Sequence, residues 1–148
     1  MSDTKVQLQV EKWVREVFLL HKFHRHFLKR GIGLIWGGSF EFDAVSDDGK
    51  TAVCISTAKS KTAGGKLGIG KCHKILADAL YLLHAKGITR RLMVFTERTM
   101  LEEFENRQNG GRFPSEIELI PADRLPVSLR NSLARSRKES SLEVTPAK

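Results

Sequence analysis

The first half of the chain alternates between helical and strand-like patterns of apolar positions. Over residues 5–30, apolar side chains recur at a spacing of three or four, which predicts one long helix ending at Gly31. A second helical pattern covers residues 71–86, and Gly87 is placed to end it. Its apolar stripe comprises Cys72, Ile75, Leu76, Ala79, Leu82 and Leu83.

Strand-like segments lie between and after these helices. The stretch from Gly33 to Lys59 predicts up to three strands, and Asp48-Gly49 in the turn at 47–50 indicates a hairpin. A buried strand is expected at 90–97 and a short one around 117–121. Together with two further helices, this order predicts an α/β protein with a mixed sheet flanked by helices. The segment 51–96 should form a right-handed crossover.

The later helices set the expected domain boundaries. Thr99 and Glu102 have the spacing of a capping box, so a third helix should begin there. Residues 1–125 are expected to form a single domain. Residues 126–148 then add a C-terminal helix and, after about residue 137, a polar tail expected to be disordered.

The hairpin carries two acids whose register can be worked out. With the turn centred on 48–49, paired positions sum to 97, so Asp43 faces Cys54 and Glu41 faces Ser56. One face then carries these four residues, and the other carries Phe40, Phe42, Val53, Ile55 and Thr57. Glu41 and Asp43 are therefore candidate ligands for one hard divalent cation such as Mg²⁺. The alternative is a pair of acids on a solvated hairpin.

A lysine-rich loop follows the hairpin, in a chain of 148 residues with a formal charge of +8. This charge favours an anionic partner, and nucleic acid, above all DNA, fits best. Residues 65–72 resemble a phosphate-binding loop, but Cys72 replaces the hydroxyl that would hold Mg²⁺. The backbone of this segment is still predicted to bind a DNA phosphate. The alternative interpretation is a mobile loop with no ligand. The candidate phosphate contacts are Lys61, Lys66, Lys71 and Lys74.

The order of elements over residues 5–125 resembles the PD-(D/E)XK, or restriction-endonuclease-like, nucleases. Asp43 in FEFDAVS matches the place of the family's first motif acid, and Glu16 is the nearest match to its helix-borne acid. The resemblance implies the α-β-β-β-α-β core of that family. The third strand departs from the pattern, because it has Cys54 or Ser56 where the family has an acid, and Ser56 or Ala58 where the family has a lysine.

Two routes would restore the missing groups under this resemblance. Glu41 could replace the acid opposite Ser56, with Lys59 turned inward by a bulge. Alternatively, the stripe of the second helix that carries Lys71, Lys74 and Asp78 could face the hairpin. Asp78 would then be the migrated acid and Lys71 or Lys74 the migrated lysine, whereas an ordinary solvated stripe with a Lys74–Asp78 pair is the other interpretation.

The resemblance implies a metal-dependent nuclease that uses Mg²⁺ or Mn²⁺. Asp43, Glu41, Lys59 and Asp78 are its candidate catalytic residues, with Glu16 and Ser56 as accessory groups. The alternative is a catalytically inactive nucleic-acid-binding domain on the same fold. Family members often pair, which leaves a homodimer open. Two isolated cysteines and a polar N-terminus predict a cytoplasmic protein without a membrane partner.

Overall fold

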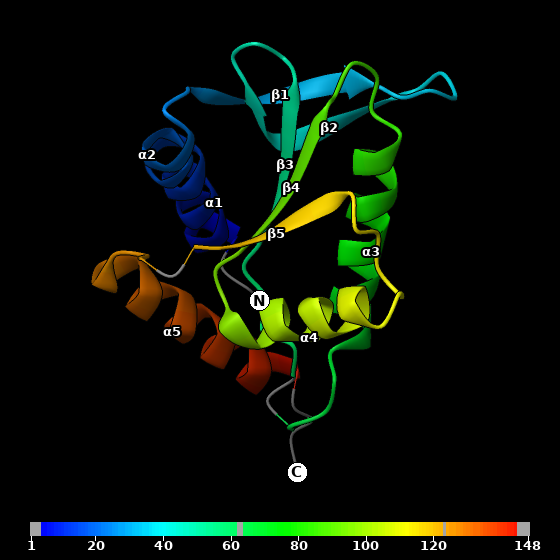
Figure 1. Ribbon diagram of the computed structural model, residues 1–148. Helices are drawn as coiled ribbons and strands as arrows, with labels where there is room; N and C mark the ends of the chain where they lie inside the picture. Colours follow the sequence, from blue (N-terminus) through cyan, green and yellow to red (C-terminus); the bar gives the residue numbers. More distant parts are fainter. Residues whose placement is uncertain (1–3, 62–63, 123, 145–148) are drawn as a thin grey trace.

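A computed structural model places a five-stranded sheet between two layers of helices (Figure 1). It describes residues 4–61, 64–122 and 124–144, with side chains from residue 5 to 137 within those ranges. The helices are α1 (Thr4–Trp13), the π-helix η1 (Val14–Phe18), α2 (Leu19–Phe23), α3 (Ile69–Leu83), α4 (Arg98–Asn109) and α5 (Val127–Val144). The strands are β1 (Phe27–Gly33), β2 (Ser39–Ser46), β3 (Thr51–Ser56), β4 (Arg90–Phe95) and β5 (Ile117–Pro121).

The sheet is mixed, as its sequence pattern predicts. Its order is β1-β2-β3-β4-β5, with antiparallel pairing from β1 to β3 and parallel pairing from β3 to β5. Strand β3 therefore has an antiparallel neighbour on one side and a parallel one on the other. The parallel step from β3 to β4 passes through α3, which lies beside the sheet in Figure 1.

Both faces of the sheet are buried, each under its own helices. Helices α3 and α4 cover one face, where Cys54 and Met93 lie in the larger apolar cluster. Segments η1 and α2 cover the other, where Val53 and Leu92 lie in the second cluster. Because neighbouring residues of β3 and β4 enter opposite clusters, these strands read as continuous apolar runs instead of alternating ones.

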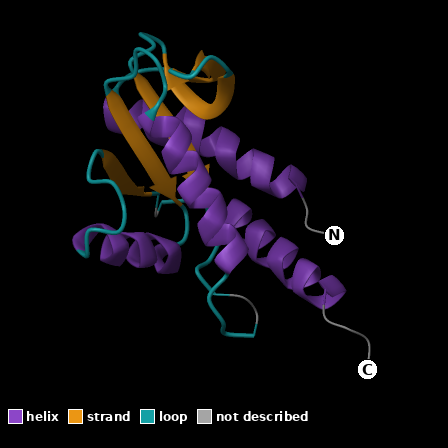
Figure 2. Cartoon of the chain, turned by 90° about the vertical axis from the view of Figure 1, so that its right-hand side faces the viewer, coloured by secondary structure: helices purple, strands orange, loops and turns teal. Residues whose placement is uncertain are grey.

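Helix α5 is attached to the body of the protein. It packs beside α1 (Figure 2), and Leu133 is buried there against Val10. Arg137 donates a 2.7 Å hydrogen bond to buried Glu97 and a 2.9 Å bond to the Thr57 carbonyl. The C-terminal helix is confirmed and extends to Val144, through residues expected to form a tail; residues 145–148 lie outside the described ranges.

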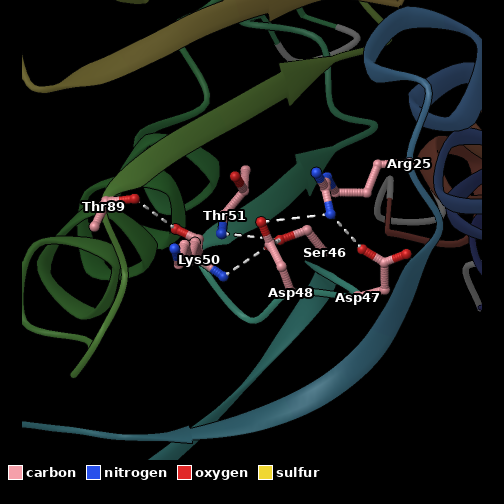
Figure 3. A network of polar contacts seen from close by, with 7 residues as sticks. All are labelled: Arg25, Ser46, Asp47, Asp48, Lys50, Thr51 and Thr89. Atoms are coloured by element: carbon pink, nitrogen blue, oxygen red, sulfur yellow. Dashed lines mark hydrogen bonds and ion pairs between the residues drawn. The ribbon is translucent and has the colours of Figure 1, made fainter.

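The β2–β3 turn is held by the side chains that its sequence provides (Figure 3). Asp48 accepts hydrogen bonds from the Ser46 hydroxyl and from the backbone N–H of Lys50. Gly49 adopts φ = 73°, a conformation that side-chain-bearing residues disfavour. The hairpin predicted from Asp48-Gly49 is thereby confirmed.

The first helix ends earlier than its apolar spacing predicts. Helix α2 stops at Phe23, and β1 begins at Phe27, which the helical pattern had included. His24 makes the break, with left-handed φ and ψ of 54° and 41°. Strand β1 gave no strand-like signal because it is a mostly exposed edge strand rich in charged residues.

The capping box at the start of α4 is not formed. The N-cap is Glu97, without a side-chain cap hydrogen bond. The Thr99 hydroxyl oxygen instead accepts a 3.2 Å hydrogen bond from the backbone N–H of Ser60. Thr99 thus fastens the segment that follows β3 to the start of α4.

Candidate functional site

A β-bulge in β2 aims the side chain of Asp43. Val45 pairs with Leu28 and Phe42 with Arg30, so three steps along β2 match two along β1. Two residues of β2, Asp43 and Ala44, therefore lie opposite a single residue of β1. A bulge of this kind bends the strand and redirects a side chain. As a result, Phe42 and Val45 share the α3 side of the sheet although they are an odd number of residues apart.

Asp43 lies where β2 and β3 separate. The register that sums to 97 is confirmed at the two described pairs, Ala44–Val53 and Val45–Ala52. Beyond them, the backbone N–H of Ile55 donates a 2.8 Å hydrogen bond to Oδ2 of Asp43. The carboxylate therefore takes the place of a backbone partner, and it lies in the gap between the strands.

Helix α3 brings a cation and a second acid to this gap. Lys74 Nζ lies 3.1 Å from Oδ2 of Asp78, whose side chain is only 10% exposed. Asp78 and Lys74 both interact electrostatically with Asp43. The polar stripe of α3 thus faces the hairpin, which was the condition for Asp78 to act as a migrated acid.

Helix α1 contributes Glu11, which the sequence interpretation missed. Glu11 is coupled to Asp43, and Arg15 of η1 donates a 3.0 Å hydrogen bond to the Asp43 carbonyl. Glu16, the helix-borne acid chosen from the sequence, lines a hollow beside Trp13, and no described contact joins it to Asp43. Helical geometry could have indicated Glu11. It lies about 60° around the helix axis from buried Val14, and therefore nearer the buried face than Glu16, which lies about 160° from Val14.

The three acids of this site, which we call the acid cluster, share one electrostatic property. Burial raises the pKa of Glu11, Asp43 and Asp78. Mutual repulsion adds to this effect, since the charge of Asp43 raises the pKa of both other acids. Burial alone would lower the pKa of Lys74, but the attraction of Asp78 and Asp43 raises it above its usual value. Groups perturbed in this way, gathered at one place, are typical of functional sites.

Cys54 of β3 is buried beside the acid cluster. It is 1% exposed, and burial first, then Asp78 and Asp43, raise the pKa of its thiol. A protonated thiol is a poor nucleophile and a poor ligand for a hard cation. Asp78 on α3 lies near enough for its charge to act on this thiol.

The arrangement predicted for Glu41 is wrong. Its side chain is 64% exposed and lies 3.6 Å from Lys29 on β1. The predicted pairing of Glu41 with Ser56 is also absent, because the described β2–β3 ladder ends at Ala44–Val53. Strict alternation had placed Glu41 and Asp43 together, and Lys29 acts on both: it pairs with Glu41, and its charge opposes the raised pKa of Asp43. The prediction that Phe40, Phe42, Val53 and Ile55 share one core face is also wrong. Phe40 and Phe42 pack with Cys54 on the α3 side of the sheet, whereas Val53 and Ile55 pack on the opposite side.

The remaining predicted residues lie along the segment after β3. Lys59, Lys61, Lys66 and Lys71 are exposed, and no described contact joins them to the acid cluster. Ser56 ends β3, and its carbonyl accepts the Thr96 N–H at 3.0 Å. The lysine-rich segment is closed on itself by the Lys61–Leu67 bridge and by the Gly68 N–H bond to the Ser60 carbonyl.

The donor set of the acid cluster suits Mg²⁺ only in part. In the described ranges, no three His, Cys, Asp or Glu side chains are close enough to form a complete metal site. Mg²⁺, however, commonly uses one or two carboxylates and keeps several waters. Asp43 meets this need, because its Oδ1 has no hydrogen bond to the described part of the chain. Two hollows, of about 500 and 450 Å³, lie beside Trp13, and the acid cluster lines neither of them.

Comparisons with known proteins give no match for this chain. No family model matches the chain, no curated protein matches it, and no solved structure matches it. Within the described ranges, no helix has the length and apolar character needed to cross a membrane.

Proposed function

We propose that this protein is a Mg²⁺-dependent nuclease of the restriction-endonuclease-like type that hydrolyses DNA phosphodiesters. The observation that carries the proposal is the position of Asp43. It lies at the separation of β2 and β3, near enough for its charge to shift the pKa of Lys74 and Asp78 on α3 and of Glu11 on α1. The α-βββ-α-β order around it is the order expected for that family.

Each member of the acid cluster then has a distinct task. Asp43 would hold the ion through Oδ1 while Ile55 fixes its orientation through Oδ2. Asp78 or Glu11 would add a second carboxylate. Burial raises the pKa of these acids, and a divalent cation bound between them would favour their charged forms. Their raised pKa values therefore fit such a site. A bound Mg²⁺ would acidify a water and offset charge on the phosphoryl oxygen.

Lys74 supplies the cation that the family pattern places on the third strand. Its pKa is raised above the usual value by Asp78 and Asp43 despite the opposing effect of burial, so it carries its charge at neutral pH. From α3 it would stabilise negative charge that develops on the phosphate. The exposed lysines of the loop and of the start of α3 would contact neighbouring phosphates along the DNA.

Cleavage of supercoiled, linear and single-stranded DNA with Mg²⁺ or Mn²⁺ tests this proposal. Asp43→Asn retains an acceptor for the Ile55 N–H but loses the charge, so cleavage should fall at least about 100-fold. Asp47→Asn is the matched control, because Asp47 is an exposed acid on the same hairpin and pairs with Arg25. Equal activity of the wild-type protein and Asp43→Asn, including no activity in both, would contradict the enzymatic proposal.

A second candidate is a non-catalytic DNA-binding domain. The observation that favours it is the third strand, where Cys54 and Ser56 occupy the places of the family's acid and lysine. This alternative predicts salt-dependent binding that survives Asp43→Asn and weakens when Lys66 and Lys71 are replaced by Ala. Metal-dependent cleavage that is lost in Asp43→Asn would exclude it.

A further inference from the structure

Four aromatic rings form a platform next to the acid cluster. Trp36, in the β1–β2 turn, lies 4.8 Å from the ring of His84 and 6.4 Å from that of Tyr81. Tyr81 in turn stacks on Phe40 of β2, with ring centres 4.2 Å apart and planes inclined by 12°. We call these four residues the aromatic platform.

The platform is held in place although Trp36 is 53% exposed. The turn that carries Trp36 is closed by a 2.8 Å hydrogen bond from the Leu34 N–H to the Gly38 carbonyl. It is also fastened to the end of α3, since the Ile35 N–H donates to the His84 carbonyl at 3.0 Å. An exposed indole on a fixed turn presents a binding surface without a large loss of conformational freedom on binding.

The platform and the acid cluster have residues on the same two elements, α3 and β2. Tyr81 follows Asp78 by three residues on α3, a rise of about 4.5 Å. Phe40 precedes Asp43 by three residues on β2. A ligand that reaches from the acids to Trp36 therefore needs only the length of a few nucleotides.

The charges beside the platform are those that suit a phosphate backbone. Lys74 lies on the α3 stripe before Tyr81, and the exposed Lys86 side chain lies against Gly33 at the base of the turn. An exposed aromatic ring flanked by cations is the arrangement on which unpaired bases stack in single-strand-binding proteins. A base inside a duplex already has both faces covered by its neighbours, so away from the duplex ends only an unpaired base offers a face to Trp36.

We infer that the substrate has unpaired nucleotides beside the phosphodiester that is cut, and that one of these bases stacks on Trp36. This inference rests on the proposed function for the location of the scissile phosphate. It names single-stranded DNA, or a duplex with a single-stranded segment, as the substrate class. The aromatic platform binds the bases, and the acid cluster with Lys74 faces the backbone.

Binding without metal tests the inference separately from hydrolysis. In Trp13→Phe, Trp36 is the only tryptophan, so its fluorescence reports on the platform alone. Titration in EDTA with a single-stranded oligonucleotide should quench this emission, and a blunt duplex of the same length should not. Quenching by both, or by neither, would overturn the inference.

Affinity measured by fluorescence anisotropy provides the second arm. Trp36→Ala should weaken binding of the single strand by about tenfold or more, whereas Trp36→Phe should retain most of it. Duplex binding should not change in either variant. Circular dichroism and thermal unfolding confirm that the variants are folded. An equal loss for both DNA forms, or no loss, would overturn the inference.

The outcomes separate this inference from the proposed function. Selective quenching and selective binding, without any cleavage, would support the aromatic platform as a site for unpaired bases. The hydrolytic proposal would then fail. Conversely, cleavage of duplex and single strand that is equally insensitive to Trp36→Ala retains the nuclease and overturns the platform. A change of oligomeric state in Trp36→Ala on size-exclusion chromatography, with DNA binding intact, would assign the platform to a second copy of the chain instead.

Discussion

Replacing Lys74 by Met tests the central ion pair of the site, because it removes the charge and retains a long side chain. Lys74 Nζ lies 3.1 Å from Asp78, and the two side chains are 72% and 10% exposed. A fully exposed pair contributes about 0–1 kcal/mol, whereas breaking a buried pair costs about 3–5 kcal/mol. With one partner in solvent and the other buried, we expect Lys74→Met to lower the free energy of unfolding by about 1–2 kcal/mol at pH 7.

The pH dependence of this loss follows from the charges of both partners. The pair exists only where Asp78 is ionised and Lys74 is protonated. Burial raises the pKa of Asp78, and the pKa of Lys74 is raised by its acidic neighbours. The cost of Lys74→Met should therefore be greatest near neutral pH, shrink as acid protonates Asp78, and shrink again above pH 10.5, where Lys74 deprotonates.

Urea and thermal denaturation at pH 7 and near pH 4 measure the effect. For a chain of this size, about 1–2 kcal/mol corresponds to a fall of about 3–6 °C in the melting temperature. Lys66→Met, which changes an exposed lysine of the neighbouring loop, is the control and should shift stability by less than about 0.5 kcal/mol. A loss that is the same at both pH values, or no larger than that of Lys66→Met, would refute the reasoning.

Two further predictions concern other charges of the site and its supports. Burial raises the pKa of Asp43, so the ionised carboxylate lowers the stability of the folded protein above the usual carboxyl pKa. Asp43→Asn should therefore be more stable than the wild type at pH 7. Urea denaturation should show that this gain disappears as the pH falls toward 4. Arg137→Ala removes the 2.7 Å hydrogen bond to Glu97, which is 8% exposed, and should cost about 2–3 kcal/mol, since Arg130 is too distant, at 4.0 Å, to replace it fully. Chemical denaturation checks the second value, and an Arg137→Ala protein as stable as the wild type would show that Glu97 finds another partner.

Local signals in the sequence determined much of the architecture. The Asp48-Gly49 turn fixed the hairpin and its register near the turn, because glycine there supplies the left-handed conformation. The apolar stripe of α3 and the runs of β4 and β5 also marked their elements correctly. These features depend on residues that are neighbours in the chain, and propensity and periodicity describe such neighbours well.

The edge strand and the strand faces depended on distant partners. Strand β1 is a strand because β2 pairs with it, and its exposed, charged residues carry no strand pattern of their own. The bulge at Asp43 arises from that same pairing. It turned Asp43 toward β3 and left Glu41 with Lys29, which no alternation rule along β2 alone could show.

The sequence by itself named Asp43, Lys74 and Asp78 among several candidate site residues and left open how they combine. Tertiary structure decided which of them meet. Packing of α3 over the sheet carried Lys74 and Asp78 to Asp43, and packing of α1 and η1 on the other face added Glu11 and Arg15. The physical reason is that burial and long-range electrostatic coupling join residues from separate elements, whereas periodicity reports only on the faces of a single one.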